Sequence, residues 1–466
     1  MKVGNKHLKA GSLYLIGNLF NNGIAFLTVP IFTRILSTYD YGIINTYSSW
    51  VAVLSMILGM TLHMAIRAAF VDYEEKIDDF MSSITALTLI STMAISFLIV
   101  TTIIVAKINI QLTLVVLCLV QGFSSAIIGN YSMYLMMKYK YKARTLLLIL
   151  PNLITTIASL VAILYIFESS KYLGKIIPSS VISFVFAFVL LVLIFNKKTG
   201  PLTTKYWKYS LAISLPIILH GLSLIILGQS DRIMLTALVG ASETGIYSLI
   251  YNFSMVANVV IVSLEGVWIP WFTEKMKNRE IEQINENVEL YIGIMTFVTI
   301  SIILISPEVL RILAPREYWH GEMIIPPIII SSYIVFIYTL YVNVEHFHKK
   351  TRHIAVNTII AASSNIILNF IFIPRYGMYA ATITTLVSYS LSLYLHYRYS
   401  RNIEKELFPI RIVLKYLFFV IFFGGIFYLI SGFMVTRWTL LVTLSLFVLV
   451  KWKGKIIDFV RGKERS

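Results

Sequence analysis

Asparagines inside an apolar segment are the first residues whose chemistry needs an explanation. Residues 11–33 are long enough to cross about 30 Å of hydrocarbon as a helix. At about 100° per residue, one stripe of this helix holds Gly11, Tyr14, Asn18, Asn21, Asn22 and Ala25. An amide in lipid must hydrogen-bond to another helix or to water. The stripe therefore either packs between helices or faces an aqueous cavity, where its amides can bind neutral polar groups.

The same design recurs about two hundred residues later, which favours the cavity. Residues 209–230 contain Ser214, Pro216, His220, Gly221, Gly228, Gln229 and Ser230, and Asp231 and Arg232 follow directly. The next apolar segment carries Tyr247, Tyr251, Asn252, Asn258 and Glu265, and later ones carry Asn343, Glu345, Asn357, Asn365 and Asn369. The amide and tyrosine side chains are thus concentrated where we expect two halves of the chain to face each other.

The composition of the chain shows to which class of protein these polar side chains belong. The chain of 466 residues is 58% hydrophobic and 13% charged, with a mean hydropathy of +0.79. A soluble core cannot bury that much apolar surface, so the chain is an all-α polytopic membrane protein. Cys118 is the single cysteine and lies in an apolar segment, which excludes intrachain disulfides and multi-cysteine metal sites. The first apolar run is too long for a signal-peptide core and should remain in the mature protein.

About fourteen transmembrane helices are expected from the apolar runs. They lie near residues 11–33, 42–66, 82–105, 109–137, 146–167, 174–195, 209–230, 244–272, 288–310, 323–344, 354–373, 377–397, 411–432 and 435–450. A turn through residues 40–42 should return the chain to the membrane after the first span. The charged residues 72–79 should form an amphipathic surface helix.

The positive charge follows the expected loops. With the N-terminus inside, 30 of the 39 Lys and Arg residues fall on one side of the membrane and 9 on the other. This bias predicts that both termini are cytoplasmic. It also accounts for most of the net charge of +16 without any nucleic-acid partner.

Two halves of the chain share a spacing. Gly42 and Gly245 lie 203 residues apart and follow similar residues. Gly174 and Gly377 are also 203 residues apart. We therefore predict an N-lobe at 1–200 and a C-lobe at 201–402, related by a pseudo-two-fold axis along the membrane normal. Residues 403–466 add two apolar helices and a basic cytoplasmic tail.

Three segments resemble one family of transporters. They are LKAGSLYLIGNLFNNGIAFLTVPIFTRILSTYDYGIINTY at the start, SDRIMLTALVGASETGIYSLIYNF at 230–253, and IPRYGMYAATITTLVSY at 373–389. All three are similar to bacterial polysaccharide flippases, the polysaccharide-transporter branch of the multidrug/oligosaccharidyl-lipid/polysaccharide exporter superfamily. The resemblance implies two six-helix lobes in the bacterial cytoplasmic membrane, working by alternating access.

The resemblance also implies a cargo, an undecaprenyl-pyrophosphate-linked oligosaccharide such as an O-antigen or capsule repeat unit. Its phosphates need cations and its sugars need amides or hydroxyls. The candidate phosphate residues are Arg34, Arg67 and Arg232, and the candidate sugar or cavity contacts are Asn18, Asn21, Asn22, Tyr251 and Asn252. The candidate coupling residues for a proton or sodium gradient are Asp231, Glu265 and Glu345. The alternatives are arginines that reach lipid headgroups and carboxylates that pair locally.

Two other classes of function remain open. A cation-coupled multidrug exporter would share the fold but needs an acidic cavity, whereas the charges on the cavity helices are mostly arginine. A membrane glycan polymerase would need a large external loop, and the longest one expected, residues 311–322, is short. We find no catalytic nucleophile motif and expect no enzyme activity and no cofactor. The expected partners are membrane lipids and other export-pathway proteins such as a polymerase.

Overall fold

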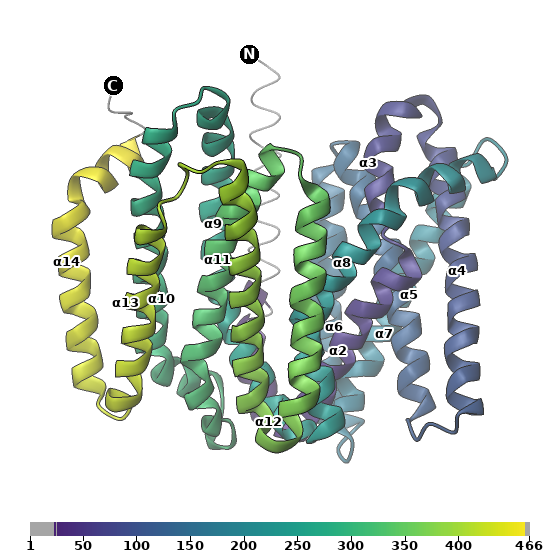
Figure 1. Cartoon of the computed structure of the whole chain (residues 1–466). Helices are drawn as coiled ribbons and strands as arrows, with labels where there is room; N and C mark the ends of the chain where they lie inside the picture. The colour runs from purple at the N-terminus through teal and green to yellow at the C-terminus, as the bar shows by residue number, and fades with distance from the viewer. Residues whose placement is uncertain (1–22, 25, 462–466) are drawn as a thin grey trace. The chain divides into compact units, whose positions relative to one another are not determined.

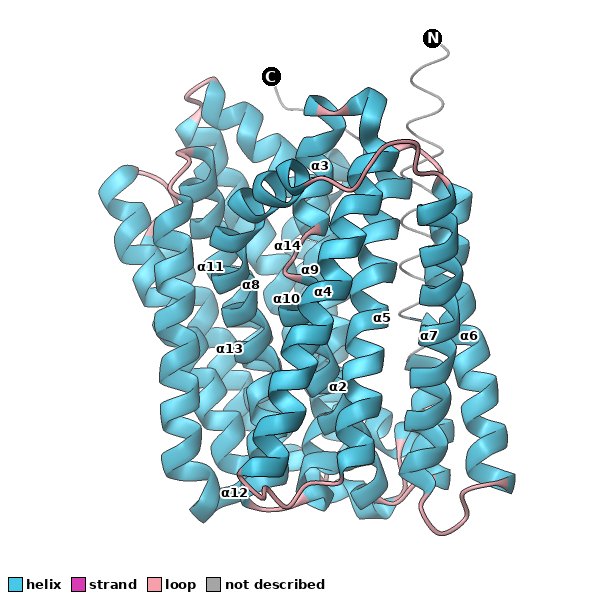
Figure 2. Cartoon of the chain, turned by 90° about the vertical axis from the view of Figure 1, so that its right-hand side faces the viewer, coloured by secondary structure: helices cyan, strands magenta, loops and turns pink. Residues whose placement is uncertain are grey.

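A computed structural model describes residues 23–24 and 26–461 of the chain, with side chains up to residue 451. All regular structure in this part of the chain is helical, and Figure 2 shows only helices joined by loops. The helices are Phe26–Ile35, α2 (Thr38–Gly59), α3 (His63–Asp72), η1 (Glu74–Lys76), α4 (Ile77–Val105), α5 (Leu112–Met137), α6 (Tyr141–Tyr165), α7 (Lys171–Asn196), α8 (Thr204–Leu238), α9 (Ala241–Lys277), α10 (Ile281–Leu313), η2 (Arg316–Ile324), α11 (Ile325–Phe347), α12 (Thr351–Ile403), α13 (Ile410–Ile430) and α14 (Met434–Arg461).

Twelve helices in the described residues are long and apolar enough to cross a membrane. One of them, α12, contains both of the spans expected at 354–373 and 377–397. Its backbone breaks at Gly377, where φ is 55° and ψ is −135°, and Figure 1 shows two helical arms that meet at a turn. The first expected span, 11–33, lies mostly outside the described residues. The prediction of an all-helical polytopic membrane protein is confirmed.

The turn expected at residues 40–42 is wrong, because these residues already belong to α2. Ser37 is the N-cap of this helix, and its hydroxyl accepts a hydrogen bond from the Asp40 N–H at 3.1 Å. The Asp40 carboxylate accepts in return from the Ser37 N–H at 3.3 Å, which completes a capping box. The chain therefore turns at Leu36 and Ser37, earlier than the charge pattern indicated.

The amphipathic surface helix expected at residues 72–79 is also absent. Helix α3 ends at Asp72, a single 3-10 turn covers Glu74–Lys76, and α4 begins at Ile77. The two acidic residues of the first turn of α4, Asp78 and Asp79, make specific contacts with other helices. The acidic run is therefore a tight connection between spans.

The chain divides into two compact units, Met1–Gly245 and Ile246–Ser466. The predicted lobes at 1–200 and 201–402 stay a prediction, because these units are defined by packing alone. In the first unit, α2 packs against α5 and α8, and α5 packs against α7. An aromatic cluster closes one end of this core, where Tyr73 makes edge contacts with Tyr206 and Tyr209 at ring distances of 5.0 and 5.1 Å.

The second unit has its own core, in which α11 packs against both arms of α12 and against α10 and α13. Its largest fully buried side chains include Phe272, Tyr333, Phe336, Tyr341 and Phe408. Trp268 of α9 stacks on Tyr291 of α10 at 4.4 Å between ring centroids. Aromatic rings thus fill the space between these helices and leave few positions for polar groups.

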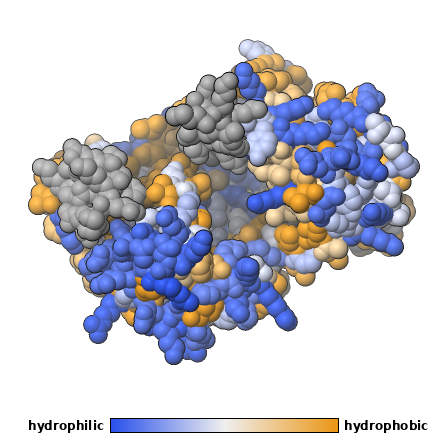
Figure 3. Space-filling model, turned by 90° about the horizontal axis from the view of Figure 1, so that it is seen from above, coloured by the Kyte–Doolittle hydropathy of each residue, from blue (hydrophilic) through white to orange (hydrophobic). Residues whose placement is uncertain are grey.

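The helix ends and the helix flanks differ in polarity. Figure 3 looks down on the ends at which α3 meets α4, and hydrophilic side chains gather on this face. By contrast, α4, α7 and α13 expose large apolar side chains such as Phe97, Phe188 and Phe418 along their length. One of the polar helix ends lies between α9 and α10, where Lys275 and Asn278 donate hydrogen bonds to the Glu280 carboxylate. These bonds hold the pKa of the Glu280 carboxyl below its usual range. The apolar flanks fit a lipid environment and the polar ends fit water.

Candidate functional site

A small polar cavity lies inside the second unit, between α9, α11 and α12. Its volume is about 180 Å³, and it is lined by Tyr251, Asn258, Ile328, Ser331, Ser332, Val335, Thr385 and Tyr389. Pockets for drug-sized ligands usually measure roughly 300–1,000 Å³. This cavity can therefore hold one small group, such as a single sugar ring.

The lining of this cavity is neutral. Hydroxyls, one amide and tyrosine rings supply its polar atoms, and none of the eight described lining residues carries a charge. Ser331 is 3% exposed and its hydroxyl donates to the Pro327 carbonyl at 2.8 Å, so its oxygen still has room to accept. Neutral hydroxyls beside aromatic rings suit a ligand that is itself rich in hydroxyls.

A buried polar seam joins the two arms of α12 and reaches the cavity through Thr385. Asn365 donates to the Thr385 hydroxyl at 3.3 Å, and Asn369 donates to Asn365 at 3.0 Å. Thr384 donates to the side-chain oxygen of Asn369. Both asparagines are 0% exposed, so these bonds hold the arms together through groups that would be costly to bury alone. These two asparagines were expected where the halves of the chain face each other, and that expectation stays a prediction.

A carboxylate and a histidine are paired deeper in the same unit. Glu345 Oε1 of α11 lies 2.8 Å from His396 Nδ1 of α12, and the side chains are 0% and 1% exposed. Asn357 Nδ2 lies 3.4 Å from the same ring nitrogen. Sequence reasoning selected Glu345 but missed His396, which is 51 residues away and was not among the polar positions singled out.

Glu265, the second coupling candidate on this unit, is half-buried on α9. It lies close to Thr339 of α11 and in electrostatic contact with Tyr291 and Tyr338. It is not a fully solvated end residue, and the ion pairs among the described residues do not include it. One expectation was that a cation would pair with Glu265, but its described neighbours include two tyrosines.

The predicted cavity contacts have different outcomes. Tyr251 lines the cavity, and its ring lies 5.9 Å from that of Tyr247. Asn252, the next residue along α9, is half-buried and is not among the lining residues. Asn18, Asn21 and Asn22 lie outside the described residues. Their role stays a prediction.

The three candidate phosphate arginines, all in the first unit, are not alike. Arg34 is exposed and donates to the Pro30 carbonyl at 2.8 Å, within its own short helix. Arg67 is exposed on α3, and the described hydrogen bonds and ion pairs include none from its side chain. Arg232 is 7% exposed on α8 and donates to Gln229 at 2.7 Å. Among the three, Arg67 has the guanidinium most open to a phosphate.

A polar contact between α2 and α8 surrounds Arg232 in the first unit. Ser49 donates to Gln229 at 2.8 Å, and the hydroxyls of Thr46 and Thr236 lie 2.5 Å apart. Asp231, the third coupling candidate, is 1% exposed beside them. The polar residues predicted on the seventh span thus pack against the second span within this unit.

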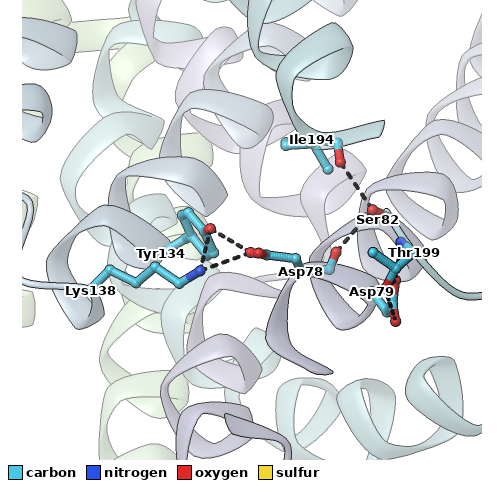
Figure 4. A network of polar contacts seen from close by, with 7 residues as sticks. All are labelled: Asp78, Asp79, Ser82, Tyr134, Lys138, Ile194 and Thr199. Carbon is cyan, nitrogen blue, oxygen red and sulfur yellow. Dashed lines mark hydrogen bonds and ion pairs between the residues drawn. The ribbon is translucent and has the colours of Figure 1, made fainter. Parts of the chain in front are cut away.

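The basic loop at residues 138–144 is partly neutralised. Lys138 Nζ lies 2.9 Å from Asp78 Oδ1, and the Tyr134 hydroxyl donates to the same carboxylate at 2.5 Å. Figure 4 shows both side chains pointing toward Asp78. The neighbouring Asp79 accepts from the backbone N–H groups of Thr199 and Gly200, each at 2.8 Å. These contacts tie α4 to α5 and to the chain after α7.

Sequence reasoning also missed a buried ion pair near the end of the chain. Arg437 of α14 is 1% exposed and donates to both carboxylate oxygens of Glu308 on α10, at 2.6 and 2.7 Å. It also donates to the Leu304 carbonyl at 2.6 Å. Arg437 lies next to Trp438, and charged residues near an aromatic residue at a span end usually reach the membrane interface. The sequence therefore did not indicate that Arg437 is buried. Among the described residues, no cluster of three or more His, Cys, Asp or Glu side chains is placed to hold a metal ion.

Comparison with known proteins places these features in a known context. The family model described as polysaccharide biosynthesis protein matches residues 8–276. A Haemophilus influenzae protein named Lsg locus putative protein 1 is 22% identical over 399 residues, which cover 82% of this chain and 96% of the relative. An uncharacterized membrane protein of the same organism is 21% identical over 363 residues, 76% of this chain and 87% of the relative.

Solved structures share the fold at low sequence identity. The lipid II flippase MurJ in an inward closed conformation superposes with a TM-score of 0.73 at 15% identity, covering 95% of this chain and 99% of that one. An inward-facing multidrug resistance MATE family transporter of the MOP superfamily superposes with a TM-score of 0.63 at 13% identity, covering 83% and 94%. At these identities the similarity establishes the fold alone.

Proposed function

Because the chain belongs to the polysaccharide biosynthesis protein family, we propose that it is a flippase for lipid-linked glycans. Its cargo is an undecaprenyl-pyrophosphate-linked oligosaccharide, such as an O-antigen or capsule repeat unit. It moves this cargo from the cytoplasmic to the outer leaflet of the bacterial cytoplasmic membrane by alternating access. The fold shared with a lipid II flippase supports the proposal.

The neutral cavity of the second unit is the observation that carries this proposal. A sugar that enters hydrocarbon loses its bonds to water, at a cost of several kcal/mol for each polar group left without a partner. Ser331, Ser332 and Thr385 offer replacement hydroxyls, and Tyr251 and Tyr389 offer aromatic faces. An apolar bundle has no structural need for such a cavity.

The pyrophosphate requires positive charge on its route. We assign its first contact to Arg67, which is exposed, and later contacts to Arg232 and Arg34. A guanidinium presents a planar fork of donors that fits two phosphate oxygens. Asn18, Asn21, Asn22 and Asn252 would add amide contacts to the sugars.

Coupling to an ion gradient completes the proposal. A proton or sodium ion binding at Asp231, Glu265 or Glu345 would drive the cycle, and no bond of the cargo would be made or broken. Both termini would lie in the cytoplasm, with the basic loops at the inner leaflet. A polymerase and other export proteins would receive the cargo outside.

A multidrug exporter is the alternative that the shared fold keeps open. A cationic drug needs carboxylates where it binds, and the described lining of the cavity offers none. The polymerase alternative has less support, since residues 311–322 are largely taken up by the ends of α10 and η2, where Tyr318 and Gly321 are buried. The favoured cargo is therefore a neutral glycan on an anionic lipid.

The test is translocation of a fluorescent undecaprenyl-pyrophosphate-linked oligosaccharide by the full chain in liposomes. Wild type should move the probe, and Ser332→Phe, which fills the cavity, should reduce the rate. The control Ser390→Phe adds the same ring at an exposed serine of α12. Export of a fluorescent organic cation without movement of the glycan probe would favour the multidrug class and overturn the proposal.

The phosphate assignment has its own test in the same liposomes. Arg67→Ala should reduce translocation without loss of protein from the membrane. Arg411→Ala removes another exposed arginine, on α13, and should have no effect. In cells, deletion of the gene should strand lipid-linked repeat units on the cytoplasmic face, and normal export without a second flippase would contradict the proposal.

A further inference from the structure

The pair formed by Glu345 and His396 holds charge where water does not reach. The two side chains are 0% and 1% exposed, and only 2.8 Å separates Oε1 from Nδ1. If the carboxylate were ionised and the imidazole neutral, the pair would bury a net negative charge. One added proton makes the pair neutral overall, either as imidazolium and carboxylate or as imidazole and carboxylic acid. The pair therefore carries no net buried charge only when it holds one proton.

The second carboxylate oxygen distinguishes this pair from a structural ion pair. Glu345 Oε2 is buried and has no hydrogen-bond partner among the described residues. A buried ion pair stabilises a fold only when further hydrogen bonds satisfy its remaining lone pairs. An oxygen without a partner is suited to take up a proton, because protonation removes the charge that lacks compensation.

Neighbouring groups leave the pair without a strong fixed charge. His346 lies in electrostatic contact with both members from α11. From α9, Glu265 faces Tyr338, and from α10 Tyr291 faces Glu265. On α12, Asn357 adds a neutral amide. The titratable neighbours on these elements are thus histidine, tyrosine and the Glu265 carboxylate, and Arg401 of α12 lies in electrostatic contact with Tyr341.

An aromatic bridge connects the pair to the cavity. The Tyr338 ring stacks on the His396 ring at 5.6 Å between centroids and on the Tyr389 ring at 6.4 Å. Tyr389 lines the cavity and lies two helical turns from His396 on α12. A ligand that moves Tyr389 therefore acts on the packing of the imidazole that holds the proton.

The pair also lies close to one end of its helices. The Lys350 N–H donates to the Glu345 carbonyl at 2.8 Å, which closes α11 directly beyond the pair. The described state keeps the pair away from water, and release of its proton requires a second state in which water reaches the carboxylate.

We propose that Glu345 and His396 together form the proton-binding site that couples transport to the proton gradient. The inference rests on the proposed flippase function and selects protons over sodium ions. In one state the pair binds a proton, which forms an O–H or N–H bond and neutralises the buried charge. In the other state that bond breaks and the proton passes to water. The step is a proton transfer only, and no group is oxidised or reduced.

The second unit contains a matched control. His348 Nε2 lies 2.9 Å from Glu404 Oε1, but these side chains are 24% and 15% exposed, and Arg279 donates to the same carboxylate. This pair has the same chemistry with access to water and a compensating cation. It should bind and release protons without any link to transport.

The first test measures proton binding without transport. Infrared difference spectra of the full chain in liposomes, recorded across a pH titration, should contain bands of the protonated pair, either the carbonyl of a carboxylic acid or the ring of an imidazolium. Glu345→Gln and His396→Gln should each remove these bands, and Glu404→Gln should leave them. Difference spectra that are the same in wild type and in both variants of the pair would overturn the assignment, whether or not the chain is a flippase.

The second test measures coupling with the fluorescent undecaprenyl-pyrophosphate-linked probe in sodium-free liposomes. An imposed pH gradient should accelerate wild-type translocation by roughly 5-fold or more. Glu345→Gln and His396→Gln should lose this acceleration, and His348→Gln should keep it. The double variant Glu345→Gln with His396→Gln leaves no single buried charge, so it should fold if a single variant does not.

The outcomes separate the two proposals. Translocation that ignores the pH gradient in wild type, or that still responds to it in the folded double variant, overturns the proton site and leaves the flippase intact. If wild type fails to move the probe under any gradient, the proposed function fails, and the coupling role fails with it.

Discussion

At the residue scale, two glycines that share an offset in the sequence lie against each other in the first unit. A Cβ on Gly42 would collide with the carbonyl of Ala241, and a Cβ on Gly245 would collide with the carbonyl of Thr38. The contact is reciprocal, since the same 203 residues separate Thr38 from Ala241 and Gly42 from Gly245. The pattern in the sequence indicated a repeat, and its physical basis is the close approach of two helix starts.

We predict that Gly42→Ala destabilises the protein by about 1–3 kcal/mol, the usual cost of inserting a methyl group into a packed contact. The opposing atoms are backbone and cannot rotate away. Unfolding in detergent micelles, followed by circular dichroism, measures the effect. Gly129→Ala on α5, where a Cβ meets nothing within 4 Å, is the control and should unfold like wild type. Equal stability of both variants would contradict the close approach.

Other residues show how far sequence reasoning reaches at this scale. Tyr251 lines a small cavity of the second unit, and its predicted contact with the cargo stays a prediction. His396 could not be found from the sequence. Its partner Glu345 lies on another helix, and only the fold brings them to 2.8 Å. Arg437 was missed for a second reason, since its place beside Trp438 at a span end suggested the membrane interface.

At the element scale, the equivalent glycines Gly174 and Gly377 prove physically different. Gly174 lies within α7, and a Cβ there would meet the Ile163 backbone N at 2.9 Å. Gly377 instead adopts φ 55° and ψ −135° at the turn between the arms of α12. Hydropathy predicted two spans here, but it could not predict that Asn365 and Thr385 would join them.

We predict that Gly377→Ala costs about 1–3 kcal/mol, because an L residue is strained in this backbone conformation. The loss should loosen the two arms and expose the buried asparagines between them. Amide hydrogen exchange of α12 measures this directly, and faster exchange around Asn365 and Asn369 is expected. Gly425→Ala on α13, with open space at its Cβ, should leave the exchange unchanged. Unaltered exchange in Gly377→Ala would show that the turn tolerates a side chain.

The attachment of α14 supplies a second prediction at this scale. Glu308→Leu should lower the free energy of unfolding by about 3–5 kcal/mol, because it leaves the Arg437 guanidinium buried without its carboxylate. The matched change Glu289→Leu breaks an exposed pair with Lys415, whose side chains are 38% and 46% exposed, and should cost only about 0–1 kcal/mol. Unfolding by sodium dodecyl sulfate in mixed micelles compares them. Similar losses would mean that α14 is held by apolar packing alone.

At the scale of the whole molecule, the composition predicted the architecture because lipid leaves few choices. Backbone groups in hydrocarbon must bond within the chain, so apolar runs of this length become helices. Hydropathy does not predict the residues at which the helices begin and end, because local contacts such as the Ser37 cap decide them. Helices α8 and α9, for example, both extend beyond the apolar runs from which they were expected. The orientation of the chain in the membrane depends instead on the loops, because Lys and Arg residues there resist transfer across the membrane.

The cytoplasmic position of the basic loops can be tested with the single cysteine. Cys118→Ser removes it, and Asn109→Cys or Lys140→Cys then places one thiol in the exposed α4–α5 or α5–α6 connection. A membrane-impermeant maleimide should label position 109 in intact cells and position 140 only after permeabilisation. The 30 to 9 division of positive residues requires this result, because a reversed chain would translocate most of its Lys and Arg residues. Labelling of position 140 from outside would invert the predicted topology.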